Sequence, residues 1–143
     1  MGLKLKWNSP VILTFALVCT TVFVADMLMM GKLMPVFTVY PSVDWSNPFS
    51  LASLVTHVFG HANLEHLLGN LTFILLLGPI IEEKYGSKSF INVLFFDTGL
   101  MGASGIVFML ILLVSFTNVS SGEIPVTFIL VALLFIGKNY YKV

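Results

Sequence analysis

All three histidines of this 143-residue chain fall within ten residues, at His57, His61 and His66. His66 and Asn70 are four residues apart, so in a helix their side chains lie on the same face. Polar and ionisable side chains in a membrane-embedded segment are costly, and they generally face the interior of a helix bundle and mark a functional site. His57 also fits a plainer role, as an interfacial side chain that is hydrogen-bonded to a neighbouring loop. The pair of His66 and Asn70 lies deeper in the apolar segment and favours a functional role.

The same histidines do not predict a metal centre. His57 and His61 have the i, i+4 spacing that can hold zinc. The metalloprotease motif, however, requires a glutamate directly after the first histidine, and Val58 stands there. The single cysteine, Cys19, allows neither a disulfide within the chain nor a cysteine-rich metal site. We therefore expect no metal and no cofactor.

A second candidate element is the sequence Gly-Ala-Ser-Gly at 102–105, which opens an apolar segment. Gly102 and Gly105 allow another backbone to approach closely. The first N–H groups of a helix have no partner within it and can stabilise a developing oxyanion beside the hydroxyl of Ser104. Taken alone, the pattern is more typical of helix packing, and we expect both glycines to pack near Gly69. It is not the nucleophile elbow of soluble hydrolases, because Ile106 occupies the position of the last glycine of that motif.

The composition indicates a membrane protein. Apolar residues make up 57% of the chain and charged residues only 10%, whereas an ordinary soluble domain has about 25% charged residues. A soluble domain of this size has too little interior to bury so many apolar side chains. The net charge of zero excludes a basic nucleic-acid-binding protein and an acidic disordered tail. We predict an all-α, polytopic membrane helix bundle.

Apolar segments bounded by charged residues predict about four spans, because a helix that crosses the bilayer needs about 20 mostly apolar residues. These spans lie near residues 10–30, 62–81, 99–117 and 124–141. Residues 31–60 contain three prolines and Trp45, which predicts a loop on the membrane interface. Residues 89–98 are apolar but too few to cross as a helix, so we predict a short irregular segment there. No change in composition marks a second domain, and residues 1–143 are predicted to form one.

The lysines predict the orientation in the membrane, which we expect to be the cell (plasma) membrane. Lys4 and Lys6 precede the first span, and the positive-inside rule therefore places the amino terminus in the cytoplasm. Lys84 and Lys88 follow the second span and lie inside again, in agreement with the first placement.

Taken together, the pattern H-x-x-x-H-x-x-x-x-H-L-x-x-N at 57–70 and the later G-A-S-G resemble the rhomboid family of intramembrane serine proteases. The likeness extends from the first span to Gly137, and includes the local sequences HANLEHLLGN, EEKYGS and TGLMGASG. It implies that Ser104 is the nucleophile and that His66 and Asn70 help the Ser104 N–H to hold the oxyanion. It implies that His57 and His61 bring water to the site.

The resemblance also assigns two further regions. Glu82 and Glu83 match the acidic end of the family's second helix. The loop at 31–60 matches the family's interfacial loop, although Trp45-Ser46 stands where the family usually has Trp-Arg.

The general base of the family is absent from the sequence. Rhomboid proteases use a histidine on a later span, in a motif similar to A-H-x-x-G, and no histidine follows His66 here. Because a serine hydroxyl is a poor nucleophile without a base, we expect this chain to be a weak protease.

Three hypotheses follow. The leading one is an intramembrane serine endopeptidase of rhomboid type, which cleaves transmembrane segments of other membrane proteins. The second is a catalytically inactive relative that binds transmembrane helices of client proteins without cutting them. The third is a small polytopic membrane protein whose histidines and Asn70 line a polar path. In each case the partners are the lipid bilayer and membrane proteins, and no nucleic acid.

The short connection before the serine decides where Ser104 lies. Only sixteen residues separate Tyr85 from Gly102. If they do not cross the membrane, Ser104 lies near the cytoplasmic face, as the lysine distribution favours. If they do cross, partly extended, Ser104 opens a helix from the outer face, as in the family. We adopt the family geometry, which predicts that Ser104 faces His66 and Asn70.

Overall fold

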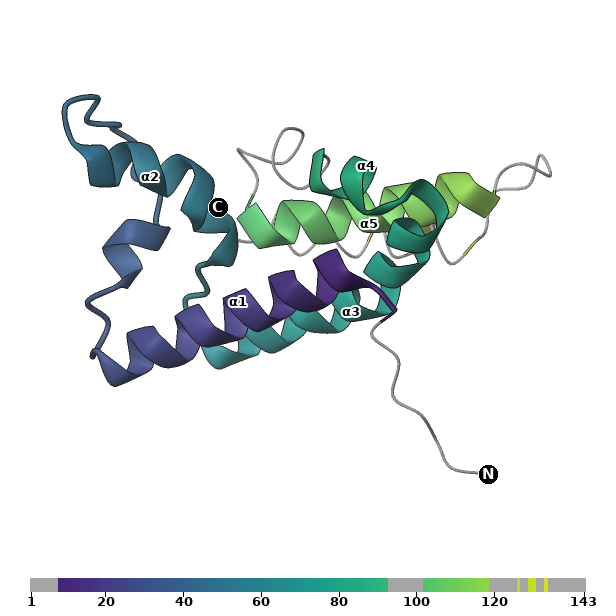
Figure 1. Ribbon diagram of the computed structural model, residues 1–143, viewed down its shortest axis with the longest axis horizontal. Helices are drawn as coiled ribbons and strands as arrows, with labels where there is room; N and C mark the ends of the chain where they lie inside the picture. The colour runs from purple at the N-terminus through teal and green to yellow at the C-terminus, as the bar shows by residue number, and fades with distance from the viewer. Residues whose placement is uncertain (1–7, 93–101, 119–125, 127–128, 131–132, 134–143) are drawn as a thin grey trace.

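The computed structural model describes residues 8–92, 102–118, 126, 129–130 and 133, and the elements formed by these residues are all helices (Figure 1). In chain order they are α1 (Pro10–Leu28), the 3₁₀ helix η1 (Met34–Phe37), α2 (Pro48–Thr56), the 3₁₀ helix η2 (His57–Phe59), α3 (Leu64–Tyr85), α4 (Ser87–Asn92) and α5 (Gly102–Asn118).

Helix α3 is the central element, with α1 and α5 packed against it (Figure 1). Helix α1 runs antiparallel to α3, and α5 begins beside the first turns of α3. Apolar side chains from α1, η2, α3, α4 and α5 meet in one core, which comprises Ile12, Phe15, Cys19, Val58, Leu67, Ile74, Ile81, Phe90, Ile106, Val107, Leu110 and Ile111. The described part of the chain is therefore a helical membrane bundle whose core joins side chains from α1 to α5.

Two of the predicted spans are found as long apolar helices. Helix α1 has 19 residues and α3 has 22, so at about 1.5 Å per residue both approach the thickness of the hydrocarbon core, about 30 Å. Pro10 occupies the first turn of α1, where its missing N–H costs nothing. Within the third predicted span, 99–117, the structure has α5, a shorter apolar helix. Most of the fourth, 124–141, lies outside the described residues.

The predictions for the connecting segments need correction. Residues 31–60 are not a plain loop, because they contain η1, α2 and η2. The sequence Asn47-Pro48 reads as a turn signal but starts α2: the Asn47 side chain accepts a hydrogen bond from Phe49 N, and Pro48 occupies the first turn. The segment predicted as irregular, 89–98, begins inside α4, and its residues 93–98 lie outside the described part of the chain.

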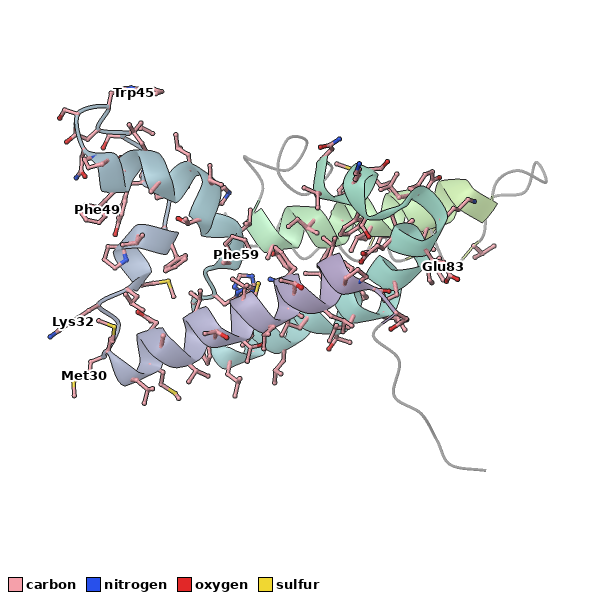
Figure 2. The ribbon with its side chains drawn as sticks, viewed as in Figure 1. Met30, Lys32, Trp45, Phe49, Phe59 and Glu83 are labelled. Atoms are coloured by element: carbon pink, nitrogen blue, oxygen red, sulfur yellow. The ribbon has the colours of Figure 1, made fainter. Side chains whose placement is uncertain are left out.

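The segment around α2 exposes large apolar side chains alongside polar ones. Trp45 is 75% exposed and Phe49 65% exposed, and both lie at the edge of the molecule away from α3 (Figure 2). Exposed aromatic residues of this kind lie at headgroup depth in membrane proteins. The predicted interfacial position of this segment is consistent with these side chains.

A buried carboxylate joins the start of α1 to the end of α3. The two oxygens of Glu82 accept hydrogen bonds from Val11 N and Ile12 N, both at 3.0 Å, and the Ser87 hydroxyl donates to Oε1 at 2.7 Å. Glu82 is 4% exposed, whereas Glu83 is exposed and points outward (Figure 2). The first N–H groups of a helix lack partners, and hydrocarbon offers none. The Glu82 carboxylate supplies the acceptors for these N–H groups from within the protein.

The close approach of α1 and α3 occurs at Gly78. A Cβ atom at this position would collide with Cδ1 and Cγ1 of Ile12, which is fully buried. At Gly69, by contrast, a Cβ would have no atom of the described residues within 4 Å. The expectation that helices pack near Gly69 is therefore wrong. Asn70 is buried, and successive residues of a helix are rotated by about 100°. Gly69, the residue before it, is therefore on the exposed side of α3.

Replacing Glu82 by glutamine should destabilise the protein. Glutamine retains one acceptor oxygen but presents an NH₂ group to one of the two backbone donors, which loses its partner. We expect Glu82→Gln to lower the free energy of unfolding by roughly 1.5–3 kcal/mol in mild detergent. Glu83→Gln, at the exposed neighbouring position, is the matched control and should change it little. Equal losses in the two variants would contradict the role given to Glu82.

A similar pair tests the contact between α1 and α3. Gly78→Ala should cost about 1–3 kcal/mol, because the added methyl group must displace the buried Ile12 side chain. Gly69→Ala introduces the same methyl group into open space and should leave the midpoint of thermal unfolding in detergent unchanged. If Gly69→Ala proved the more damaging variant, the packing described for Gly78 would be incorrect.

Candidate active site

Ser104 lies at the start of α5 and faces the first turns of α3. Its Oγ is 3.2 Å from His66 Nε2 and 3.5 Å from Asn70 Oδ1. The first distance is that of a hydrogen bond, and the second is long for one between two oxygens. The structure thus brings together the serine, the histidine and the asparagine that were expected to meet, from segments 34 residues or more apart in the chain.

The start of α3 is fixed by Asn63, which the sequence analysis did not single out. Its side chain accepts a hydrogen bond from His66 N at 2.8 Å and caps the helix. The cap defines where α3 begins, and the helical repeat then places His66 and Asn70 on one face. The preference for asparagine at helix N-caps is the signal that could have identified it.

His61 is buried directly behind His66. Its side chain is 1% exposed, and the ring centroids of the two imidazoles are 5.2 Å apart. His61 Nδ1 lies 3.1 Å from the carbonyl oxygen of Phe59, a contact that favours the tautomer in which Nδ1 carries the proton. Nε2 then has no hydrogen to donate and can only accept.

Burial lowers the pKa of His61. Desolvation is the largest cause, the hydrogen bond to the Phe59 carbonyl acts in the opposite direction, and the charge of a protonated His66 lowers the pKa further. The imidazole of His61 is therefore neutral at pH 7.

His57 lies on η2, and its Nδ1 is 3.0 Å from the carbonyl oxygen of Ser53 in α2. The partner thus belongs to a helix four residues earlier, because the segment that was expected to be a loop forms α2 at this point. Of the two glycines that flank the serine, Gly105 is buried. The surroundings of Gly102 are outside what the structure describes.

Three buried polar atoms near the site have no hydrogen-bond partner among the described residues: Nε2 of His57, Nε2 of His61 and Nδ2 of Asn70. Buried polar groups in folded proteins are nearly always paired, with protein or with water. The amide of Asn70 is a donor 7% exposed beside Ser104, and its position suits a developing negative charge on a carbonyl oxygen. No group of three potential metal ligands is found in the described part of the chain.

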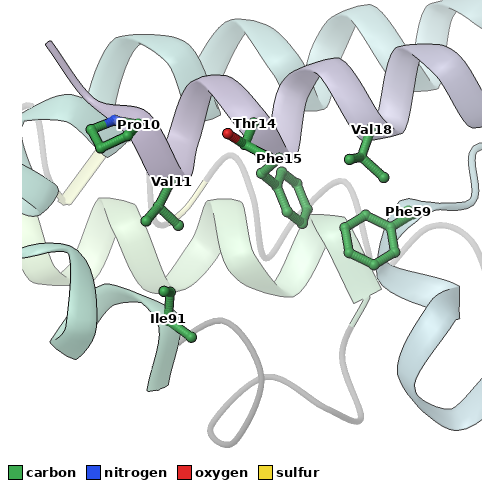
Figure 3. A pocket seen from close by; sticks show the side chains of 7 residues that line it. All are labelled: Pro10, Val11, Thr14, Phe15, Val18, Phe59 and Ile91. Carbon is green, nitrogen blue, oxygen red and sulfur yellow. The ribbon is translucent and has the colours of Figure 1, made fainter. Parts of the chain in front are cut away.

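An apolar cavity of about 350 Å³ lies along α1 (Figure 3). The described residues that line it are Pro10, Val11, Thr14, Phe15, Val18, Phe59 and Ile91. It contains none of the candidate catalytic residues, so we do not assign the chemistry to it.

Comparison with known proteins gives two matches. The model of the rhomboid domain matches residues 48–110, which include every histidine, Asn70 and Ser104. The "Rhomboid-like protease 3" of Toxoplasma gondii is 43% identical over 54 residues, which are 38% of this chain and 20% of that protein. The match thus spans about one fifth of the relative. Residues 48–110 are thus similar to the rhomboid domain, and the described part of the chain is all-helical, as that resemblance implies.

The buried His61 predicts a pH-dependent stability. Its pKa is lower in the folded protein than the ordinary value of 6.5, so below that value the unfolded chain binds the proton more readily. The stabilisation is complete above about pH 6.5 and is lost progressively as the pH falls toward the folded-state pKa. The melting temperature in detergent should therefore fall between about pH 7.5 and about pH 5.5.

The variant His61→Gln should show a smaller fall over the same range, because glutamine does not titrate. Parallel curves for the two proteins would mean that His61 titrates alike in the folded and unfolded states.

Proposed function

We propose that this chain carries the active site of an intramembrane serine endopeptidase of rhomboid type, which hydrolyses peptide bonds in transmembrane segments of other membrane proteins. The observation that carries the proposal is the 3.2 Å contact between Ser104 Oγ and His66 Nε2 at the start of a helix, beside the buried Asn70 Nδ2, which has no hydrogen-bond partner among the described residues. The matches to the rhomboid domain and to a rhomboid-like protease support it.

In the proposed reaction Ser104 Oγ attacks the carbonyl carbon of the substrate peptide bond. Its proton passes to a base, and the carbonyl oxygen becomes an oxyanion. Asn70 Nδ2, His66 and the Ser104 N–H stabilise this oxyanion. The amine then leaves with a proton, and a water molecule releases the acyl group from Ser104.

His57 and His61 are proposed to handle that water. Nε2 of each is buried without a partner among the described residues and can accept a hydrogen bond from it. Gly102 and Gly105 allow the substrate backbone to come close. We place the protein in the plasma membrane with its amino terminus in the cytoplasm, and its partners are transmembrane helices of substrates.

The proposed reaction needs a general base in addition to these groups. The family uses a histidine on a later span, and the imidazole that contacts Ser104 in this chain is His66. A relative that binds transmembrane helices without cutting them is therefore the second candidate. Its supporting observation is that all three histidines precede or open α3.

A fluorophosphonate probe distinguishes the two candidates. We expect the 143-residue chain in detergent to be labelled slowly at Ser104, because loss of a base lowers the rate by several orders of magnitude but leaves residual reactivity. Asn70→Ala should slow it by a further factor of about 10²–10³. Ser104→Ala should abolish labelling. Ser115→Ala, on the same helix with its hydroxyl bonded to Ile111 O, is the matched control.

The absence of any labelling at Ser104 would contradict the protease and favour the helix-binding relative. Rapid labelling that is lost in Ser104→Ala would show that a base is already present within these residues.

A further inference from the structure

Residues 57–63 join α2 to α3 and carry His57 and His61. We call this segment the histidine turn. It is held from two sides by elements that lie elsewhere in the sequence, and neither contact belongs to the catalytic residues.

The first side is η1. A Cβ atom on Gly60 would lie 2.7 Å from Phe37 Cβ and 2.7 Å from the Phe37 carbonyl oxygen. Contacts this short do not occur in proteins, so the turn passes over η1 at a distance that only glycine permits. One residue before the turn, the Thr56 hydroxyl donates to the carbonyl oxygen of Val36 at 2.6 Å. The backbone of η1 thus lies against the middle of the turn at Gly60 and against Thr56, the residue before the turn.

The second side is α1. The ring of Phe59 packs against that of Phe15, with centroids 5.2 Å apart (Figure 3). Phe15 is 5% exposed, and Val58 beside Phe59 is 3% exposed, so both belong to the core. The position of Phe59 is therefore set by α1.

These two contacts determine where His61 lies. Its Nδ1 is bonded to the carbonyl of Phe59, and its backbone follows directly after Gly60. The His61 ring in turn packs against His66, which contacts Ser104. A displacement of η1 would therefore move His61 and, through its contact with His66, change the contact between His66 and Ser104.

We propose that Phe37 and Thr56 are positioning residues for His61. The contacts with η1 fix the position of the histidine turn, so that the ring of His61 stays buried against His66. The consequence for Ser104 rests on the proposed function, whereas the positioning of His61 does not.

Nuclear magnetic resonance of protein labelled in its histidines tests the positioning directly, because only three histidines contribute. In detergent micelles, Gly60→Ala should raise the pKa of His61 toward the ordinary value, since the added methyl group pushes the turn off Phe37 and admits water. Gly69→Ala, whose methyl group enters open space, should leave that pKa unchanged.

A milder pair keeps the test decisive if Gly60→Ala does not fold. Thr56→Val removes the hydroxyl that reaches Val36 and should shift the His61 pKa in the same direction, while Thr56→Ser should restore it. Thr38→Val is the control, because the Thr38 hydroxyl bonds to Met34 O within its own segment. An unchanged His61 titration in folded Thr56→Val would overturn the proposal.

Labelling of Ser104 by the fluorophosphonate provides the second readout. We expect Gly60→Ala to slow it by roughly 10–100-fold, the effect of a small misplacement in an active site. An unchanged rate of labelling at Ser104, together with a shifted pKa of His61, would overturn the part of the proposal that connects η1 to the serine. If wild-type chain is not labelled at all, the proposed function fails, and the resonance titration still decides the role of Phe37 and Thr56.

Discussion

The Glu82 carboxylate accepts hydrogen bonds from the first N–H groups of α1 and lies near the end of α3, so it fixes the register of two antiparallel membrane helices. A membrane helix cannot leave these donors to water, because the hydrocarbon core contains none. The helix dipole adds to the attraction, since its positive end meets a negative charge. With α1 held in this register, Ile12 packs onto Gly78 and α3 becomes the fixed element from which the site is built.

The candidate site lies at the opposite end of α3 from Glu82. Asn63 caps the helix, and His66 and Asn70 share a face of its first turns. The start of α5 then brings the Ser104 hydroxyl to His66. Catalytic groups must be held to within a fraction of an ångström, and groups on helices meet this requirement better than groups on loops. His57 and His61 lie instead on the turn that precedes α3, and this turn lies close to Phe15 of α1 and Phe37 of η1.

The family match and the structure bear on different questions. The match covers residues 48–110 and shows that this region is similar to the rhomboid domain, and the part matched to the relative is about one fifth of that protein. The structure adds the geometry of a serine, a histidine and an asparagine. Because an acyl-transfer reaction also needs a base, the activity depends on a group that these contacts do not supply.

The sequence by itself determined the membrane class and the two long helices, because charge-free segments of about 20 residues have few other stable conformations. It also determined the shared face of His66 and Asn70, since a spacing of four follows from the helical repeat. The helices within 31–60 were missed because Asn47-Pro48 starts a helix as readily as it makes a turn. The lysine distribution and the family geometry placed Ser104 on different sides, and the prediction that it faces His66 came from the resemblance; the packing of α5 against α3 brings the two together. Gly69 and Gly78 look alike in the sequence, yet only Gly78 faces α1. Which face of a helix meets a neighbour depends on contacts between residues distant in the chain, and no local pattern contains that information.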